Sequence, residues 1–463
     1  MKSNACYNLN SGWTNAAWQC TYGYVYTEVQ KAEKNFYGND NLKGYLGITE
    51  ILKVELMHRI ADTYGPLVYH QLGETPRVYG QQEAYTRFFA DLDEGQQLIR
   101  EYLDEGGDNN KFKEYDMLTN GKTLKEWLKF ANSLRLRLAM RISNVDATLA
   151  KDQATKALND NQGVLEGARE TIAVMGKNYI NPLCAVAGWG EVYMNASMES
   201  IVNGYEDPRG KKWYNTALLE GYQKQLLGIP IGLPMKDGDA NIYSFCSSLN
   251  TSTIGEKTGA VLMSAAEVWL LRAEAALRGY TKENPRTCYE YGVSTSFTQW
   301  DCAGASEYLE SDKTPADYKD VVSGGKVGKD MKALITISPK WEEDADIETK
   351  LEKIITQKWL ACWPESYEAW AEQRRTGYPK LFKVQNNTGK VIDTDIMIRR
   401  LPFSTDAATA DPAQYATLTE KLGGADNGAT RLWWDTGEKL FLEQTPRNRK
   451  PCHHNGYHAH QLD

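Results

Sequence analysis

Histidines are too few in this sequence to support most nucleophilic or metal-dependent chemistry. Only His58 and His70 lie in the body of the chain, and the other four follow a basic stretch near its end. A Ser-His-Asp triad would have to use one of these two, and no G-x-S-x-G segment presents a nucleophile. The sequence also contains no P-loop, dinucleotide fingerprint, H-E-x-x-H segment or EF-hand loop. It therefore predicts no catalytic residue, metal ligand or cofactor, and it leaves Ca²⁺ binding open.

Carboxylates are the alternative source of catalysis. Two Asp or Glu side chains flanking a glycosidic bond would make a glycosidase, and Asp301 after Trp300 and Asp435 after Trp434 are the candidates. No spacing indicates two acids that face each other, and acids on loops usually stay solvated or cap helices. The sequence therefore favours a protein that is not an enzyme, and a helical glycosidase remains an alternative.

Tryptophan is the residue type whose placement points to a function. The chain has 13 Trp and 27 Tyr against 10 Phe, and Trp13, Trp18, Trp189 and Trp300 lie outside the clear helical stripes, near Gly, Asn, Gln and Thr. An indole face packs against the C–H face of a sugar while neighbouring amides and hydroxyls bond its hydroxyl groups. These four are therefore predicted to stack on a glycan, with partial burial as a packing anchor the competing interpretation for each. The tryptophans on helical stripes are predicted to be core residues: Trp127, Trp269, Trp359, Trp363 and Trp370.

The elements that would position these rings are mainly helices. Apolar residues recur at steps of three and four in segments 44–62, 123–144, 259–280 and 355–375. Pro364 is expected to break the last segment. Long Gly-, Asn- and Asp-rich stretches separate them, at 104–121, 202–258 and 281–345, and Leu334–Ser338 is the best strand signal. The sequence predicts a mostly α-helical protein with large loop excursions.

Composition and charge argue against several classes of partner. The net charge of −8 argues against nucleic acid or an anionic membrane surface, because both attract cationic proteins. No apolar run reaches the length of about 18 residues that a membrane-spanning helix needs, and the first residues do not resemble a secretory signal. The eight cysteines form no C-x-x-C pair. Cys288 and Cys302 could close a short loop, but free thiols are the favoured interpretation.

Several segments, in order along the chain, resemble the SusD/RagB-like outer-membrane lipoproteins of Bacteroidetes, in the branch described as starch-binding. The match extends from about residue 11 to 435. The segments that carry it are ADTYGPLVYHQ (61–71), EWLKFANSLRLRLAMRISNVD (126–146), NPLCAVAGWGEVYMNASMESIVNGYEDPRGKKWY (181–214), LMSAAEVWLLRAEAALRGY (262–280), YEYGVSTSF (289–297), IITQKWLACWPESYEAWAEQRRTGYPKLF (354–382), IRRLPF (398–403) and NGATRLWWD (427–435).

The resemblance implies a fold and a task. The fold would be a scaffold of four tetratricopeptide-like helix pairs that supports a loop-rich, irregular ligand-binding part. The task would be to capture glycans at the cell surface, on the outer membrane, for a SusC-like TonB-dependent transporter; some relatives take peptides instead. Trp13 and Trp18 lie just before the first long helix, where the starch-binding relative has a stacking Trp.

Other recurring residues of the family resemble supports of the fold. They are Asp207-Pro208-Arg209, Gln357-Lys358-Trp359, Arg374-Arg375 and Trp433-Trp434. Arg374 and Arg375 are expected to form buried or half-buried ion pairs with nearby acids on their helix.

The resemblance also predicts the organisation of the chain. Residues 1–436 would form one SusD-like domain, with excursions at about 202–258 and 281–345. Residues 437–463 resemble nothing in the family and are expected to be a disordered, appended tail. The lipoprotein signal and lipidated cysteine of the family are expected to precede this chain, so that the membrane would be reached only through an anchor absent from it.

Overall fold

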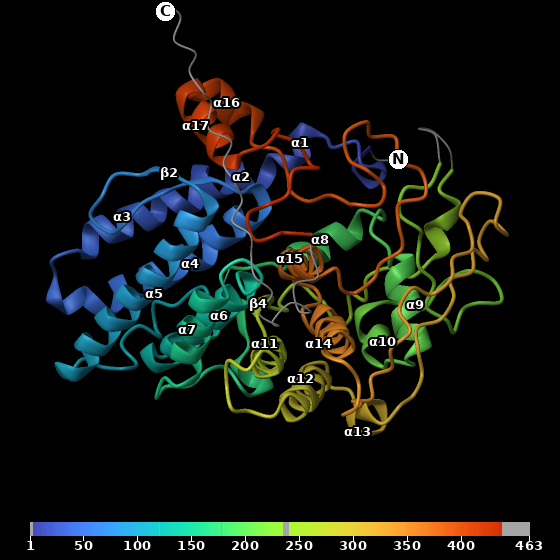
Figure 1. The fold of residues 1–463 in the computed structure, drawn as a ribbon, viewed down its shortest axis with the longest axis horizontal. Coiled ribbons are helices and arrows are strands. Elements are labelled where there is room, and N and C mark those ends of the chain that lie inside the picture. Colours follow the sequence, from blue (N-terminus) through green and yellow to red (C-terminus); the bar gives the residue numbers. More distant parts are fainter. Residues whose placement is uncertain (1–2, 120, 177, 235–239, 438–463) are drawn as a thin grey trace, which may run out of the picture.

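Four pairs of antiparallel helices form the scaffold of the molecule. The computed structural model describes residues 3–119, 121–176, 178–234 and 240–437. The pairs are α4 (Lys43–Tyr64) with α5 (Gln81–Asp104), α6 (Leu124–Arg141) with α7 (Ala147–Leu158), α11 (Ala265–Leu277) with α12 (Pro285–Gln299), and α14 (Ile347–Ala361) with α15 (Ser366–Thr376). Figure 1 shows the pairs following one another across the lower half of the view, from blue to orange. The expected helix-pair scaffold is confirmed.

Successive pairs pack on each other. Helix α5 contacts α6, α6 contacts α11, and α11 contacts α14, while α15 returns to contact α4. Helices α4 and α5 approach closely at Gly47 and Gly95, where a Cβ on Gly47 would lie 2.5 Å from the Gly95 carbonyl oxygen. Only glycine permits this crossing, because any side chain would force the two helices apart.

Shorter elements and loops cover the scaffold. The remaining α-helices are α1 (Ser11–Thr14), α2 (Ala16–Cys20), α3 (Tyr26–Phe36), α8 (Pro182–Gly188), α9 (Ala196–Gly204), α10 (Arg209–Trp213), α13 (Ala305–Leu309), α16 (Thr405–Ala410) and α17 (Pro412–Leu422). Two antiparallel ribbons complete the structure: β1 (Leu67–Tyr69) pairs with β2 (Arg77–Tyr79), and β3 (Ile172–Val174) pairs with β4 (Ala260–Met263). No helix in the described part of the chain is both long and apolar enough to cross a membrane.

The predicted helical segments agree with α4, α6 and α11, and segment 355–375 divides into α14 and α15 around Pro364 as expected. Helix α6 begins after Thr123 because Thr123 and Glu126 form a reciprocal cap. The Glu126 N–H donates to Thr123 Oγ1 at 3.2 Å, and the Thr123 N–H donates to Glu126 Oε2 at 2.8 Å. Two expectations are wrong. Leu334–Ser338 is not a strand, and the excursion 281–345 contains the long helix α12.

Buried charges join the helix pairs. The buried ion-pair network comprises Asp62, Arg137, Arg141, Glu267, Glu274, Lys358, Glu368, Glu372 and Arg375. Arg375 confirms its expected role, with Nη2 at 2.6 Å from Glu274 Oε2 and 2.5 Å from Glu372 Oε2. Arg374 does not pair as expected; it donates to the Arg399 carbonyl at 2.7 Å and lies over the Trp370 ring. Asp207 and Arg209 form a separate buried pair at 2.6 Å, which fits their expected structural role.

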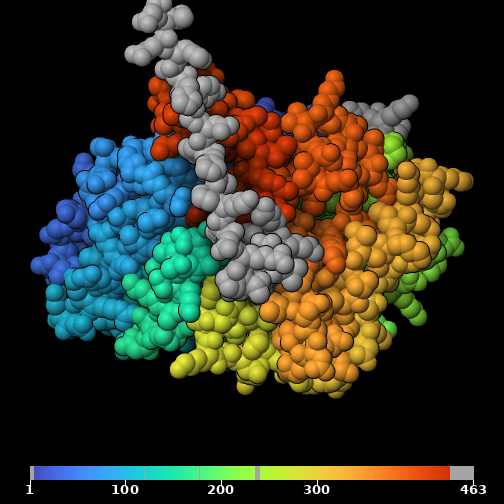
Figure 2. Space-filling view, in the orientation of Figure 1, coloured from blue at the N-terminus to red at the C-terminus, as the bar shows by residue number. Residues whose placement is uncertain are grey.

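The C-terminal segment closes the structure. Trp434 is buried and its indole N–H donates to Asp62 Oδ1 at 2.7 Å. Asp435 pairs with Arg399 at 2.6 Å, and Arg400 donates to the Tyr64 carbonyl at 2.9 Å. In Figure 2 this red segment lies between the blue N-terminal helices and the orange segments that precede it in sequence. Residues 438–463, where the disordered tail is expected, lie outside the described residues, and the single-domain boundary at 436 stays a prediction.

Candidate functional site

The four tryptophans predicted to bind a ligand divide into two exposed and two buried rings. Trp13 is 68% exposed and Trp189 is 61% exposed, whereas Trp18 and Trp300 are 5% and 8% exposed. The two buried rings cannot stack on a ligand in this structure. For Trp18 and Trp300 the prediction is therefore corrected, and the packing-anchor interpretation holds.

Trp18 is buried because α2 packs against α4 and the C-terminal segment. Its ring lies edge-on to Tyr64 at 5.3 Å between centroids and to Phe403 at 5.8 Å. Its backbone N–H donates to the Tyr64 hydroxyl at 3.3 Å. This aromatic group attaches the N-terminal helices to the scaffold.

Trp300 is buried because it ends the apolar stripe of α12. Tyr289, Val293 and Phe297 are buried at successive four-residue steps, and Trp300 follows three residues later. The indole packs edge-on against Trp213, with centroids 6.0 Å apart. The helical spacing was present in the sequence and could have identified Trp300 as a core residue.

Trp13 lies in the short helix α1 and Trp189 directly follows the short helix α8, and both helices are capped at their starts. The Asn10 side chain caps α1 by accepting from the Gly12 N–H at 2.9 Å. The buried Asn181 caps α8 by accepting from the Leu183 N–H at 2.9 Å, and its amide donates to the Thr258 carbonyl at 2.9 Å. Two exposed indoles on a fixed backbone can offer flat apolar faces to a ligand at little entropic cost.

A further cavity, absent from the expectations, lies among tryptophans that were predicted to be core residues. This aromatic cavity has a volume of about 290 Å³. Trp359, Trp363 and Trp370 are only partly buried because one side of each borders it. By contrast Trp127 is buried as expected, and Trp269 is half-buried against Tyr291. The cavity is lined by Asn195, Met198, Tyr214, Trp359, Trp363, Pro364, Glu365, Ser366, Ala369, Trp370, Gln373, Leu381 and Met397.

Hydrogen bonds fix the rings that line the aromatic cavity. The Trp363 indole N–H donates to the Tyr214 hydroxyl at 3.0 Å, and one face of the ring stacks on Trp213 at 5.1 Å. The Trp370 indole N–H donates to the Ile398 carbonyl at 3.2 Å. Since these N–H groups are already used, both rings offer apolar surface to whatever occupies the cavity.

A larger, polar cavity of about 970 Å³ lies where β2, the start of α5 and the end of α17 meet. Several of its charged side chains form ion pairs. Arg77 lies 2.8 Å from Glu83, Lys421 lies 3.6 Å from the same carboxylate, and Arg431 pairs with Asp435 at 2.7 Å.

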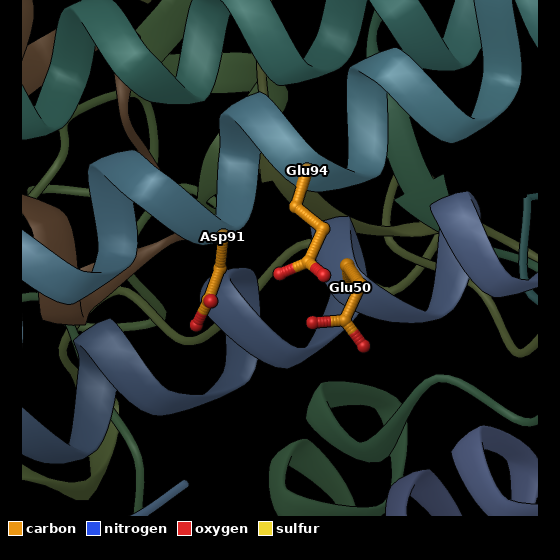
Figure 3. A group of neighbouring side chains, drawn as sticks. All are labelled: Glu50, Asp91 and Glu94. Carbon is orange, nitrogen blue, oxygen red and sulfur yellow. The ribbon is translucent and has the colours of Figure 1, made fainter. Parts of the chain in front are cut away.

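An acidic cluster lies between α4 and α5, where Glu50, Asp91 and Glu94 have carboxylate oxygens within 4.8 Å of one another. Figure 3 shows Asp91 and Glu94 extending from α5 toward α4, which carries Glu50. Lys53 Nζ already lies 2.6 Å from Glu50 Oε2 and 3.8 Å from Asp91 Oδ2. Burial raises the pKa of Glu50 well above its usual range, and the neighbouring Lys53 ammonium opposes this rise. Lys53 thus places a positive charge among these carboxylates.

The residues considered for catalysis lie in different environments and have different contacts. Asp435 is buried against Arg399, whereas the Asp301 side chain is fully exposed and lies 3.5 Å from Lys212. His58 is buried and hydrogen-bonded to the Val54 carbonyl at 3.1 Å, and His70 lies between Tyr26 and Glu33, at 2.5 Å from each. Cys288 and Cys302 are free thiols, as favoured. The two candidate carboxylates, Asp301 and Asp435, therefore lie in different environments, one exposed and one buried, which does not suit a glycosidase pair.

Comparison with known proteins identifies the family. A family model described as SusD-like, SusD and RagB outer-membrane lipoprotein, matches residues 1–435. The chain belongs to the SusD/RagB family. No curated protein sequence matches it.

Solved structures of SusD homologues are similar over nearly their whole length. A homologue from Bacteroides vulgatus is 54% identical, with a TM-score of 0.91 over 94% of this chain and 88% of that one. A SusD homologue from Flavobacterium johnsoniae described as chitin-binding is 35% identical, with a TM-score of 0.88 over 95% and 90% of the two chains. A SusD-like protein from Bacteroides thetaiotaomicron is 30% identical, with a TM-score of 0.84 over 93% and 89%.

Proposed function

We propose that this SusD-family protein is a non-enzymatic, surface-exposed glycan-binding subunit that passes oligosaccharides to a SusC-like TonB-dependent transporter. The observation that carries the proposal is the pair of exposed indoles, Trp13 and Trp189, on capped backbone. The chitin-binding relative supports a glycan as the ligand. A protein that takes peptides on the same scaffold remains the alternative.

Exposed indoles serve sugars better than peptides for a physical reason. A pyranose presents a flat row of C–H groups that covers one ring face, and its hydroxyls remain hydrated at the edge. One way to capture an extended peptide is to add it as a strand at a sheet edge. The two ribbons of this structure are short, with three or four residues per strand.

Titration calorimetry with a glycan panel and an oligopeptide panel tests the ligand class. Trp13→Ala and Trp189→Ala should each weaken glycan binding about five- to tenfold, since a stacked ring contributes about 1 kcal/mol beyond burial. Tyr37→Ala removes an equally exposed ring on another part of the surface and serves as the control. Unchanged glycan affinity in both tryptophan variants, or binding of peptides alone, would contradict the proposal.

Two further assays test the rest of the proposal. Incubation with the bound glycan should release no new reducing ends, and their appearance would favour the glycosidase alternative. Co-purification from an expressing Bacteroidetes cell should recover a large outer-membrane β-barrel. Recovery of the protein free of any such partner from solubilised outer membranes would count against transporter delivery.

A further inference from the structure

We infer that the polar cavity between β2, α5 and α17 binds the carboxylate of an acidic sugar unit, such as a uronic acid. This inference rests on the proposed glycan-binding function and adds to it a ligand charge and a second group of residues. The charge of the lining, the exposure of its cations and the volume of the cavity support it.

The lining of the polar cavity is cationic, although the whole chain has a net charge of −8. Four cationic and two acidic side chains line it: Arg77, Arg87, Lys421 and Arg431 with Glu74 and Glu83. A concave surface with an excess of one charge concentrates ions of the opposite charge. The cavity is therefore suited to an anionic ligand.

One part of this excess arises because two cations share the carboxylate of Glu83. Arg77 Nη1 lies 2.8 Å from Glu83 Oε1, and Lys421 Nζ lies 3.6 Å from Glu83 Oε2. One carboxylate balances only one of the two cations. The Arg77 and Lys421 side chains are 54% and 36% exposed, so an entering anion can reach both.

A second part of the excess is at Arg431. Its Nη1 lies 2.7 Å from Asp435 Oδ1, but Arg399 already donates to both oxygens of Asp435, at 2.7 and 2.6 Å. Arg399 and Asp435 are buried, whereas the Arg431 side chain is 37% exposed at the cavity. Arg87 differs, because buried Asp91 accepts from its Nε at 2.5 Å.

Three separate elements bring the three shared cations to the same cavity. Arg77 lies in β2, Lys421 lies in the last turn of α17, which contacts β2, and Arg431 belongs to the C-terminal segment. The volume of about 970 Å³ is near the upper end of the range for ligand pockets, about 300–1,000 Å³. A sugar unit can therefore enter together with its neighbours in an oligosaccharide.

The donors at the cavity match a carboxylate on a sugar. A guanidinium group can donate to both oxygens of a carboxylate, and an ammonium group adds a point charge. Gln71 and Gln82 also line the cavity, and amide groups both donate to and accept from sugar hydroxyls. An acidic sugar can use both sets of groups, whereas a neutral sugar can use only the second as effectively.

Hexagalacturonate and its fully methyl-esterified form are the matched probes, because they share a backbone and differ in the charge of each carboxyl group. Calorimetry at about 20 mM sodium chloride should show at least about fivefold tighter binding of the acid. The preference should shrink at about 0.3 M, because salt screens charges that are exposed to solvent.

Three substitutions test the assigned residues, with effects of opposite sign. Arg77→Gln and Lys421→Gln should each weaken hexagalacturonate binding about two- to fivefold, the range for an exposed charge pair, and leave the ester unchanged. Glu83→Gln should tighten it by a similar factor, because the ligand then no longer competes with Glu83 for the two cations. Glutamine can still accept from the Gly80 N–H, as Glu83 does at 3.3 Å, so the start of α5 is retained.

The controls make the same charge changes in an exposed pair on α12. Arg286 pairs with Glu290 at 2.7 Å, and Arg286→Gln and Glu290→Gln should not change the binding of either probe. Equal shifts in these controls would show that only the net charge of the protein matters and would overturn the inference.

The remaining outcomes separate this inference from the proposed function. A preference for the acid that survives combined Arg77→Gln and Lys421→Gln, with the fold confirmed by circular dichroism, would overturn the polar cavity as the acid site. Equal binding of acid and ester, or binding of neither while other glycans bind, would also overturn it and leave the glycan-binding function standing. Binding of peptides and of no glycan would overturn both.

Discussion

Replacing Arg375 by methionine should lower the free energy of unfolding by about 3–5 kcal/mol, the usual cost of removing one partner from a buried ion pair. The Arg375 side chain is fully buried, and its guanidinium donates to both oxygens of Glu274, at 2.8 and 2.6 Å, and of Glu372, at 3.0 and 2.5 Å. Methionine fills similar space but leaves both carboxylates short of a partner. Glu274 keeps Arg278 at 2.8 Å, which places the expected loss within this range rather than above it.

The measurement is urea unfolding at pH 7 followed by circular dichroism. Arg286→Met is the matched control, because Arg286 pairs with Glu290 at 2.7 Å with side chains that are 42% and 37% exposed. A surface pair of this kind contributes about 0–1 kcal/mol. Equal and small losses in the two variants would refute the view that the buried ion-pair network holds the helix pairs together.

Acid provides a second measurement on the same variant. Burial alone would raise the pKa of Glu372, but Arg375, Lys358 and Arg141 lower it from 4.5 to about 2. A depressed folded-state pKa adds stability that is present above pH 4.5 and is lost as the pH falls toward 2. Arg375→Met should flatten this part of the stability profile, since the pKa of Glu372 rises when its strongest cationic partner is removed. A profile as steep as that of the unmodified protein would contradict the assignment.

Three further predictions concern single side chains. Burial raises the pKa of Glu199 from 4.5 to about 8, so folding favours its protonated form and stability falls as the pH rises from 4.5 to 8. Glu199→Gln should remove that fall in thermal melts. An unchanged pH dependence would contradict this prediction. Gly47→Ala should cost about 1–3 kcal/mol through its clash with Gly95, whereas Gly23→Ala, with open space around it, should not destabilise the protein. Cys20 is exposed and free, so Ellman's reagent should label it in the native state, and Cys20→Ser should remove one rapidly reacting thiol.

Apolar spacing in the sequence was sufficient to predict the scaffold where a stripe is continuous, as in α6. It was insufficient for α5, whose stripe of Ala84, Phe88 and Leu92 meets Gly95 before resuming at Ile99. A glycine at that position ordinarily indicates a break, but here it serves the crossing with Gly47. The residue that requires glycine at position 95 is Gly47, which lies on another helix, so no local sequence pattern could indicate it.

The site could be predicted only in part for a related reason. Residue type indicated which rings could stack, but burial of Trp18 depends on Tyr64 and Phe403, which are distant in sequence. The aromatic cavity has the same origin, since Asn195, Trp370 and Met397 meet only in the folded chain. Trp13 and Trp189, which lie outside the helical stripes of the sequence, are exposed, and their stacking on a ligand stays a prediction.

The contacts that Trp434 and Asp435 make with the scaffold form late in biosynthesis. Asp62 receives Trp434 only after almost the whole described chain has left the ribosome, and Arg399 must wait for Asp435. Until then Asp62 lacks its Trp434 donor and Arg399 lacks its carboxylate partner, which favours an incompletely closed intermediate that chaperones can hold. A premature stop a few codons before 434 should therefore yield a protease-sensitive chain, although every helix of the scaffold would already have been translated.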